Sequence, residues 1–279
     1  MPDVHKLGVI SSVQYSLCKD GVAKVMVEYV VLGLAAFSAG LVDAVVGGGG
    51  LIQLPAMFSI FPNMAPATII GTNKLASVCG TSVAAVSYAR RVAIAWTVAT
   101  PAAIAALIFS FFGAYTVTKV SPDFFRAALP IVLLAVAIYT FAKKDFGSVH
   151  APLHTGRKEQ TLVLLIGSGI GFYDGFFGPG TGSFLVFLFV RIFGFDFLGA
   201  SAVAKIVNVA CNLSALVWFG YSGHLIWQLG AMMAMCQIAG SVIGSQLAMK
   251  HGSGFVRKLF LIVVSILIVK TGYDAWLRW

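Results

Sequence analysis

The chain has 279 residues, of which 59% are hydrophobic and only 10% are charged, and its mean hydropathy is +0.92. Soluble domains carry roughly a quarter charged residues, so this composition excludes a water-soluble globular protein. The formal net charge is +9, but the basic residues stand singly or in pairs at the ends of apolar segments. That distribution is typical of positive-inside anchors and argues against a nucleic-acid partner.

In chain order, a polar tail at 1–24 precedes the first apolar segment. Six apolar runs approach or exceed the ~20 residues that cross the hydrocarbon core of a bilayer: 66–89, 92–118, 124–142, 198–219, 225–248 and 258–277. Two further apolar segments are interrupted by glycines: 25–61 and 160–195. These runs predict an all-α polytopic membrane protein whose main partner is the lipid bilayer.

The two interrupted segments begin two related halves. Residues 40–126 align without a gap on residues 171–257, an offset of 131 residues, with 17 identities in 87 positions. The matches include residue types that apolar sequences rarely share by chance: Asp43 with Asp174, Lys74 with Lys205, and Trp96 with Trp227. We therefore predict a tandem duplication, with repeat one at 25–142, a hydrophilic linker at 143–159 and repeat two at 160–279.

Two topologies fit this organisation. If each interrupted segment is one broken crossing, the repeats are parallel and the chain crosses the membrane about eight times. If each is a re-entrant hairpin, every repeat has three crossings and the repeats are inverted. Both arrangements put ten flanking Lys and Arg inside and six outside, so the positive-inside rule does not separate them. Both place the linker 143–159 in the cytoplasm.

The glycine clusters at 47–50 and 178–182 are predicted to break helices inside the membrane. Unwound backbone is tolerated there only where protein or a water-filled cavity covers it, and glycine allows both the turn and close approach of a ligand. Half-helices that start after the breaks would point their N-termini, which favour anions, toward a substrate. The residues predicted to bind substrate are Gly48, Gly49, Gly50, Gly180, Thr181, Gly182 and Ser183.

Two lysines extend the predicted anion site. Lys74 and Lys205 each lie about eight residues inside an apolar run, or ~12 Å deep at 1.5 Å per residue. A lysine at such depth costs at least ~2.5 kcal/mol unless it faces a cavity or a partner, and snorkelling to the surface would be difficult. We expect the pair to form a positive pocket, with further ligands at Thr72, Asn73 and Asn208 and neighbouring donors at Ser77, Thr81, Ser201 and Asn212.

Asp43 and Asp174 each precede a glycine cluster by four residues. In a low-dielectric site either carboxylate could pair with a lysine, carry a coupling proton or ligate sodium. Alternatively, each could cap free backbone N–H groups at a helix break. The sequence leaves both roles open.

Other chemistry lacks a motif. The four cysteines show no CxxC spacing and the five histidines lie mostly in the tail and loops, so we predict no metal site and no cofactor. The sequence contains no GxSxG, HExxH or Walker A pattern. We therefore expect neither an enzyme nor an ATP-driven pump.

The repeated motifs resemble those of a known family. Gly40-Leu-Val-Asp43 and Gly71-Thr-Asn-Lys74 are similar to the first signature of the TauE/SafE-type sulfite exporters. Gly178-Pro-Gly-Thr-Gly182 and Ala200-Ser-Ala-Val-Ala-Lys205 are similar to the second, and the resemblance covers about 28–275. It implies an inner-membrane exporter of sulfite, sulfonates or related organic anions with about eight spans.

The residues and the resemblance together favour a secondary transporter of a small oxyanion. A passive anion channel is the alternative, because selectivity in a channel uses the same dipoles and charges. The sequence does not specify the anion, the direction of transport, the coupling ion (proton, sodium or membrane potential alone) or whether two copies form a homodimer.

Overall fold

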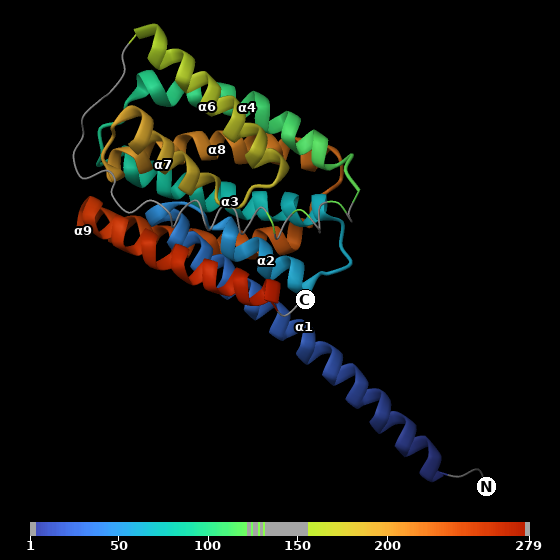
Figure 1. Ribbon diagram of the computed structural model, residues 1–279. Coiled ribbons are helices and arrows are strands. Elements are labelled where there is room, and N and C mark those ends of the chain that lie inside the picture. Colours follow the sequence, from blue (N-terminus) through green and yellow to red (C-terminus); the bar gives the residue numbers. More distant parts are fainter. Residues whose placement is uncertain (1–3, 122–123, 125–127, 129–130, 132–155, 277–279) are drawn as a thin grey trace.

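The computed structural model describes residues 4–121, 156–276 and three single positions between these ranges. Its regular structure within those ranges is entirely helical. The helices are, in chain order (Figure 1), α1 (Val4–Val46), α2 (Gly50–Ile60), α3 (Pro66–Ala89), α4 (Trp96–Val117), α6 (Gly156–Phe176), α7 (Thr181–Phe193), α8 (Phe197–Tyr221) and α9 (Trp227–Trp276).

Five helical segments are long and apolar enough to cross a membrane: Val25–Val46, Pro66–Ala89, Trp96–Val117, Phe197–Tyr221 and Trp227–Gly252. Large apolar side chains such as Leu34 and Ile108 are exposed near the middle of these segments, as expected of surfaces that face lipid. The prediction of an all-helical membrane protein is thus confirmed. The helix α1 starts at Val4, inside the segment interpreted as a polar tail, whereas the run 124–142 and most of the linker 143–159 lie outside the described residues.

Both predicted breaks occur at the glycine clusters. Between α1 and α2, Gly47 and Gly48 have φ values of 78° and 90°, and between α6 and α7, Gly178 and Gly180 have φ values of 85° and 79°. This left-handed region is open to glycine at little cost. The breaks therefore depend on glycine for their backbone conformation.

At each break the chain turns back along the preceding helix. Gly49 lies against the backbone carbonyl of Ala39, ten residues earlier. At the second break, the Tyr173 hydroxyl donates to the Pro179 carbonyl at 2.6 Å, and the rings of Tyr173 and Phe184 have centroids 5.5 Å apart. The returning helices α2 and α7 have 11 and 13 residues, or about 16 and 20 Å, which is shorter than a membrane crossing.

The halves of the chain interlock. Helix α4 packs on α6 and α8, and α9 packs on α1 and α3, while α3 and α8 contact each other at the centre. Adding the 131-residue offset to α3 (66–89) gives 197–220, and α8 spans 197–221. The close contact of Gly171 with Ala106 has a counterpart at the same offset, that of Gly40 with Gln237. Each half thus covers the broken segment of the other.

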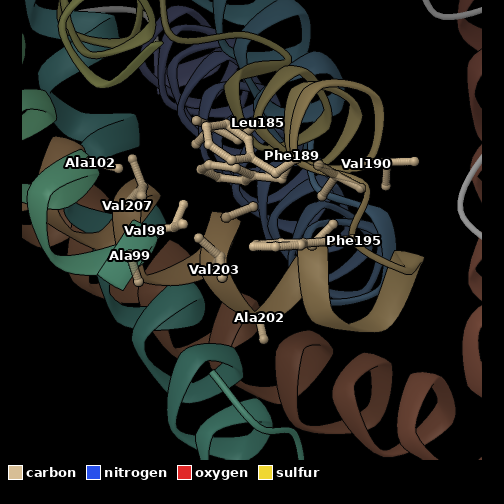
Figure 2. Packing of buried hydrophobic residues seen from close by; sticks show 14 of the residues in the cluster. Val98, Ala99, Ala102, Leu185, Phe189, Val190, Phe195, Ala202, Val203 and Val207 are labelled. Carbon is tan, nitrogen blue, oxygen red and sulfur yellow. The ribbon is translucent and has the colours of Figure 1, made fainter. Parts of the chain in front are cut away.

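Each short helix lies on its own apolar cluster. Leu185 and Phe189 of α7 pack with Val203 of α8 and Val98 of α4 (Figure 2). Leu54 and Met57 of α2 belong to a second cluster, whose other buried members come from α1, α3, α4, α8 and α9. This packing fixes the N-terminal ends of α2 and α7 near the middle of the bundle.

Candidate functional site

The two helix breaks touch each other. A Cβ atom built on Gly182 would lie 2.9 Å from the Gly47 Cα, and one on Gly47 would lie 2.6 Å from the Ser183 backbone nitrogen. The Ser183 hydroxyl donates to the Val46 carbonyl at 3.5 Å across the same contact. Because only glycine allows this approach, the N-termini of α2 and α7 meet at one junction.

A small cavity of about 20 Å³ lies at this junction, which is room for one or two water molecules. An ion of several heavy atoms needs more space than this volume provides. The lining residues come from both breaks and from α3, α8 and α9: Asp43, Gly48, Gly49, Gly50, Asn73, Lys74, Ser77, Thr81, Asp174, Gly178, Gly180, Thr181, Gly182, Asn208, Asn212 and Gln237.

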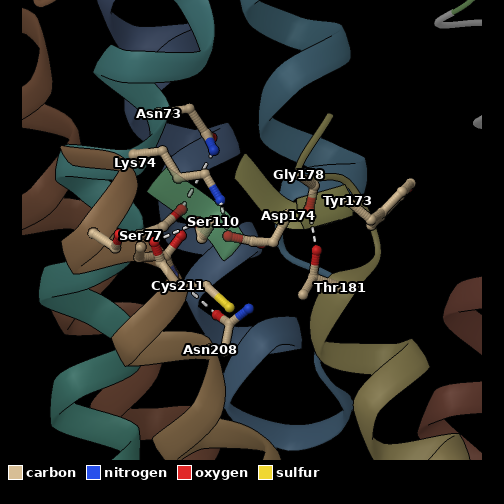
Figure 3. A network of polar contacts seen from close by, with 12 residues as sticks. Asn73, Lys74, Ser77, Ser110, Tyr173, Asp174, Gly178, Thr181, Asn208 and Cys211 are labelled. Carbon is tan, nitrogen blue, oxygen red and sulfur yellow. Dashed lines mark hydrogen bonds and ion pairs between the residues drawn. The ribbon is translucent and has the colours of Figure 1, made fainter. Parts of the chain in front are cut away.

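A buried ion pair crosses the cavity from one half to the other. The Lys74 ammonium of α3 donates to the Asp174 carboxylate of α6 (Figure 3), and both side chains are only 2% exposed. The ammonium also lies beside the second break, since a Cβ on Gly178 would be 3.5 Å from Lys74 Nζ. The Lys74 ammonium therefore lines the cavity while it is bonded to the Asp174 carboxylate.

Lys205 has a different partner. Its ammonium is 1% exposed and donates to the backbone carbonyl of Asp43, and the residue is not part of the cavity lining. The Asp43 carboxylate accepts from the Thr81 hydroxyl at 3.0 Å and from the Gly49 N–H at 3.5 Å. Asp43 therefore stabilises the turn of the first break, which is the capping role considered from the sequence.

Most of the residues predicted to bind substrate come together here. Those that line the cavity are Gly48, Gly49, Gly50, Asn73, Lys74, Gly180, Thr181, Gly182 and Asn208, together with both aspartates. Ser183 lies at the junction without lining the cavity. The Thr72 hydroxyl donates to the Thr68 carbonyl at 2.7 Å and accepts from the Ile226 N–H at 3.1 Å, so it ties α3 to the segment before α9.

One lining residue was missed by the sequence analysis. Gln237 of α9 is 1% exposed and lines the cavity, but it lies in an apolar run and has no polar counterpart in the other half, where Ala106 stands 131 residues earlier. A single amide within a membrane-spanning run is itself a signal. This signal comes from the single residue and not from the repeat.

The buried charges around the junction balance. Two lysines and two aspartates sum to zero when all four are ionised, so the expected positive pocket also contains its own counter-ions. Among the residues that the structure describes, no group of three or more His, Cys, Asp or Glu side chains could hold a metal ion. An anion that enters the site must therefore compete with Asp174 for the Lys74 ammonium.

Comparison with known proteins identifies the family of the chain. Residues 32–271 match the family described as sulfite exporter TauE/SafE. The chain belongs to this family. The match covers most of the sequence and confirms the resemblance drawn from the two repeated motifs.

Several TauE/SafE relatives resemble the chain over nearly its full length. The probable membrane transporter protein ORF9 of Sinorhizobium sp is 37% identical over 239 residues, 86% of this chain and 90% of that protein. The probable membrane transporter protein YfcA of Escherichia coli (strain K12) is 34% identical over 248 residues, with coverages of 88% and 90%. No solved structure matches the chain. Family and relatives identify a multi-pass membrane transporter.

Proposed function

We propose that the protein is a secondary transporter that exports a small oxyanion, such as sulfite or a sulfonate, across the inner membrane. The observation that carries this proposal is the Lys74–Asp174 ion pair, buried beside a cavity where two helix N-termini meet. The family name adds support, because it describes sulfite exporters.

In this proposal the anion occupies an enlarged form of the cavity. Lys74 supplies the full positive charge, and the N-termini of α2 and α7 each add roughly half a charge together with free N–H donors. Thr181 and Asn208 line the same cavity. The Asn208 amide can donate to the anion, and the Thr181 hydroxyl, which now donates to the Gly178 carbonyl at 2.9 Å, would have to turn toward it. Lys205 does not contact the anion in this proposal; its ammonium stabilises the first break by donating to the Asp43 carbonyl.

Binding of an anion requires Asp174 to release Lys74. Both groups compete for the same ammonium, and an added negative charge would leave the balanced site with a net charge in a medium of low dielectric. Protonation of Asp174 removes both obstacles. We therefore assign Asp174 as the coupling residue, with Asp43 as the second candidate. A monoanion and a proton would then move together without net charge, and outward flux would follow accumulation of the anion in the cell.

We propose the inverted topology with re-entrant hairpins. The reversal of the chain at both breaks and the short lengths of α2 and α7 support it. The α3–α4 connection, the start of α6 and the α7–α8 connection lie at one end of the bundle (Figure 1). Basic residues gather at this end, namely Arg90, Arg91, Arg157, Lys158 and Arg191, so we assign it and the linker 143–159 to the cytoplasm.

Positions 91 and 222, which are 131 residues apart, test this topology. Single cysteines at Arg91 and Ser222, introduced in a cysteine-free background, would be labelled with a membrane-impermeant maleimide. Inverted repeats place the two positions on opposite sides, so only Ser222→Cys reacts in intact cells. Labelling of both positions from the same side would mean parallel repeats.

Flux in proteoliposomes tests the transport site. We expect Lys74→Met to lower sulfite and sulfonate flux at least about 30-fold, because removing one member of a buried charge pair costs 2 kcal/mol or more. Lys250→Met, at an exposed lysine of α9, is the control and should retain full flux. The double variant Lys74→Met/Asp174→Leu removes both charges and so avoids leaving a carboxylate unpaired.

Undiminished flux in Lys74→Met and in the double variant would refute the proposed site. Electrical recording from the same liposomes separates transporter from channel. A transporter gives saturable flux that responds to a pH gradient, whereas an ohmic anion current would identify a passive channel.

A further inference from the structure

Two amide side chains make the cavity asymmetric. Several polar lining residues occur as pairs at the 131-residue offset, such as Ser77 with Asn208 and Thr81 with Asn212. Asn73 and Gln237 have no such partner, because alanines (204 and 106) occupy the equivalent positions. One part of the cavity wall therefore carries polar groups that the other half does not repeat.

Both amides have an unsatisfied end. Asn73, 3% exposed, donates through Nδ2 to the Ser77 hydroxyl at 3.4 Å, and its Oδ1 has no hydrogen-bond partner among the described residues. Gln237, 1% exposed, likewise leaves its Oε1 without a partner in the described part of the chain. Buried polar atoms are rarely left unpaired, so two in one small cavity point to a ligand.

The backbone makes room for Gln237. A Cβ on Gly80 of α3 would lie 2.6 Å from the Gln237 Cγ, so any larger residue at position 80 would displace this side chain. Asn73 lies seven residues earlier on the same helix, next to Lys74 in sequence. The amides and the ammonium thus line the same cavity and could contact different parts of one ligand.

We propose that Asn73 and Gln237 form a second subsite, which binds a hydroxyl group of the transported anion. This inference rests on the proposed transport function and narrows its substrate class to oxyanions that carry their own O–H, such as a hydroxylated sulfonate or a protonated oxyanion. A hydroxyl can donate to the unpaired oxygen of one amide and accept from an N–H of the other, so a single hydroxyl group can bond to both side chains. The lining that the structure describes offers no second lysine or arginine for a further anionic group, since the Lys205 ammonium is bonded to the Asp43 carbonyl and does not line the cavity.

Two sulfonates of similar size test the subsite. Binding of 2-hydroxyethanesulfonate and of propane-1-sulfonate, which has a methyl group in place of the hydroxyl, would be measured by calorimetry on the purified full-length protein. We expect the hydroxylated anion to bind at least about tenfold more tightly, because its analogue leaves buried amides unpaired. In Gln237→Ala, which copies the residue of the other half, this preference should fall to about one.

Matched variants separate the subsite from the fold. Gln246→Ala, at an exposed glutamine of α9, should keep the full preference. Gln237→Met preserves side-chain length without the amide and replaces Gln237→Ala if that variant unfolds. Equal binding of both sulfonates by the wild type, or an unchanged preference in the Gln237 variants, would overturn the inference. If both sulfonates bind equally but depend on Lys74, the proposed function survives this failure; if neither depends on Lys74, both proposals fail.

Discussion

The two halves of the site contain the same lysine and aspartate but connect them differently. In one, Lys74 bonds to the carboxylate of Asp174 in the cavity; in the other, Lys205, which does not line the cavity, bonds to the backbone carbonyl of Asp43. An ion pair between side chains can be exchanged for a substrate, whereas a bond to a backbone carbonyl fixes the chain. Under the proposed function, the first pair would bind the substrate and the second would stabilise the framework.

The largest expected difference is between the breaks themselves. Gly47→Ala should lower the free energy of unfolding by about 3–5 kcal/mol, because it adds left-handed strain and a clash with the Ser183 backbone. Gly178→Ala should cost only about 1–2 kcal/mol, since its added Cβ finds its nearest atoms at 3.4 and 3.5 Å. Denaturant unfolding in detergent measures both, and equal losses would contradict the comparison.

The lysines should separate stability from binding. Lys205→Met should cost about 3 kcal/mol of unfolding free energy, because it removes the buried cation beside Asp43. The folded fraction should still bind ethanesulfonate within about threefold of the wild type, in contrast to the loss of about 30-fold or more expected for Lys74→Met. Calorimetry at matched folded concentrations provides the measurement; equal loss of affinity in both variants would assign both lysines to binding.

The aspartates should differ in their effect on affinity. Asp174→Asn should bind ethanesulfonate about tenfold more tightly than the wild type, because the neutral amide no longer competes for the Lys74 ammonium. Asp43→Asn should change this affinity by less than about threefold, since the Asp43 carboxylate bonds to Thr81 and Gly49. Calorimetry provides the measurement; equal gains in both variants would contradict the assignment of Asp174 as the group that must release Lys74.

The smallest expected effect concerns a tyrosine outside the cavity lining. The Tyr88 hydroxyl donates to the Ala44 carbonyl at 3.0 Å in the first half, and Phe219 occupies the equivalent position in the second. Tyr88→Phe makes the halves alike and should cost about 1 kcal/mol of stability. Thermal unfolding should detect the loss while substrate affinity stays unchanged. A change in affinity would show that this hydrogen bond influences the site.

Much of the helical pattern could be predicted from local sequence. The apolar run 66–89 coincides with α3, and both glycine clusters interrupt helices, because hydrophobicity and left-handed backbone are properties of short segments. The direction of the chain after each break could not be predicted, since glycine permits a broken crossing as well as a hairpin. The structure shows it through contacts at both breaks, because Gly49 lies against the Ala39 carbonyl and Phe184 packs against Tyr173.

The partners of the ionisable residues were also beyond the sequence. The repeat places a lysine 31 residues after each aspartate, but it does not indicate whether the pairs form within a half or between halves. Interlocking of α4 with α6 and of α9 with α1 joins Lys74 to Asp174, 100 residues away. Gln237 was not predicted as a lining residue, because the equivalent position in the other half is Ala106 and the repeat therefore does not mark it.

The crossed pairing has a consequence for biosynthesis. When the ribosome has completed α3 and α4, the ammonium of Lys74 is already in the membrane, but its carboxylate partner in α6 has not been made. The helices against which α4 and α1 pack, α6 and α9, are likewise synthesised later. Early segments must therefore remain loosely assembled until the later ones are synthesised, since Asp174 follows Lys74 by 100 residues. A gene divided at the linker should yield fragments that are degraded when made alone and rescued when co-expressed.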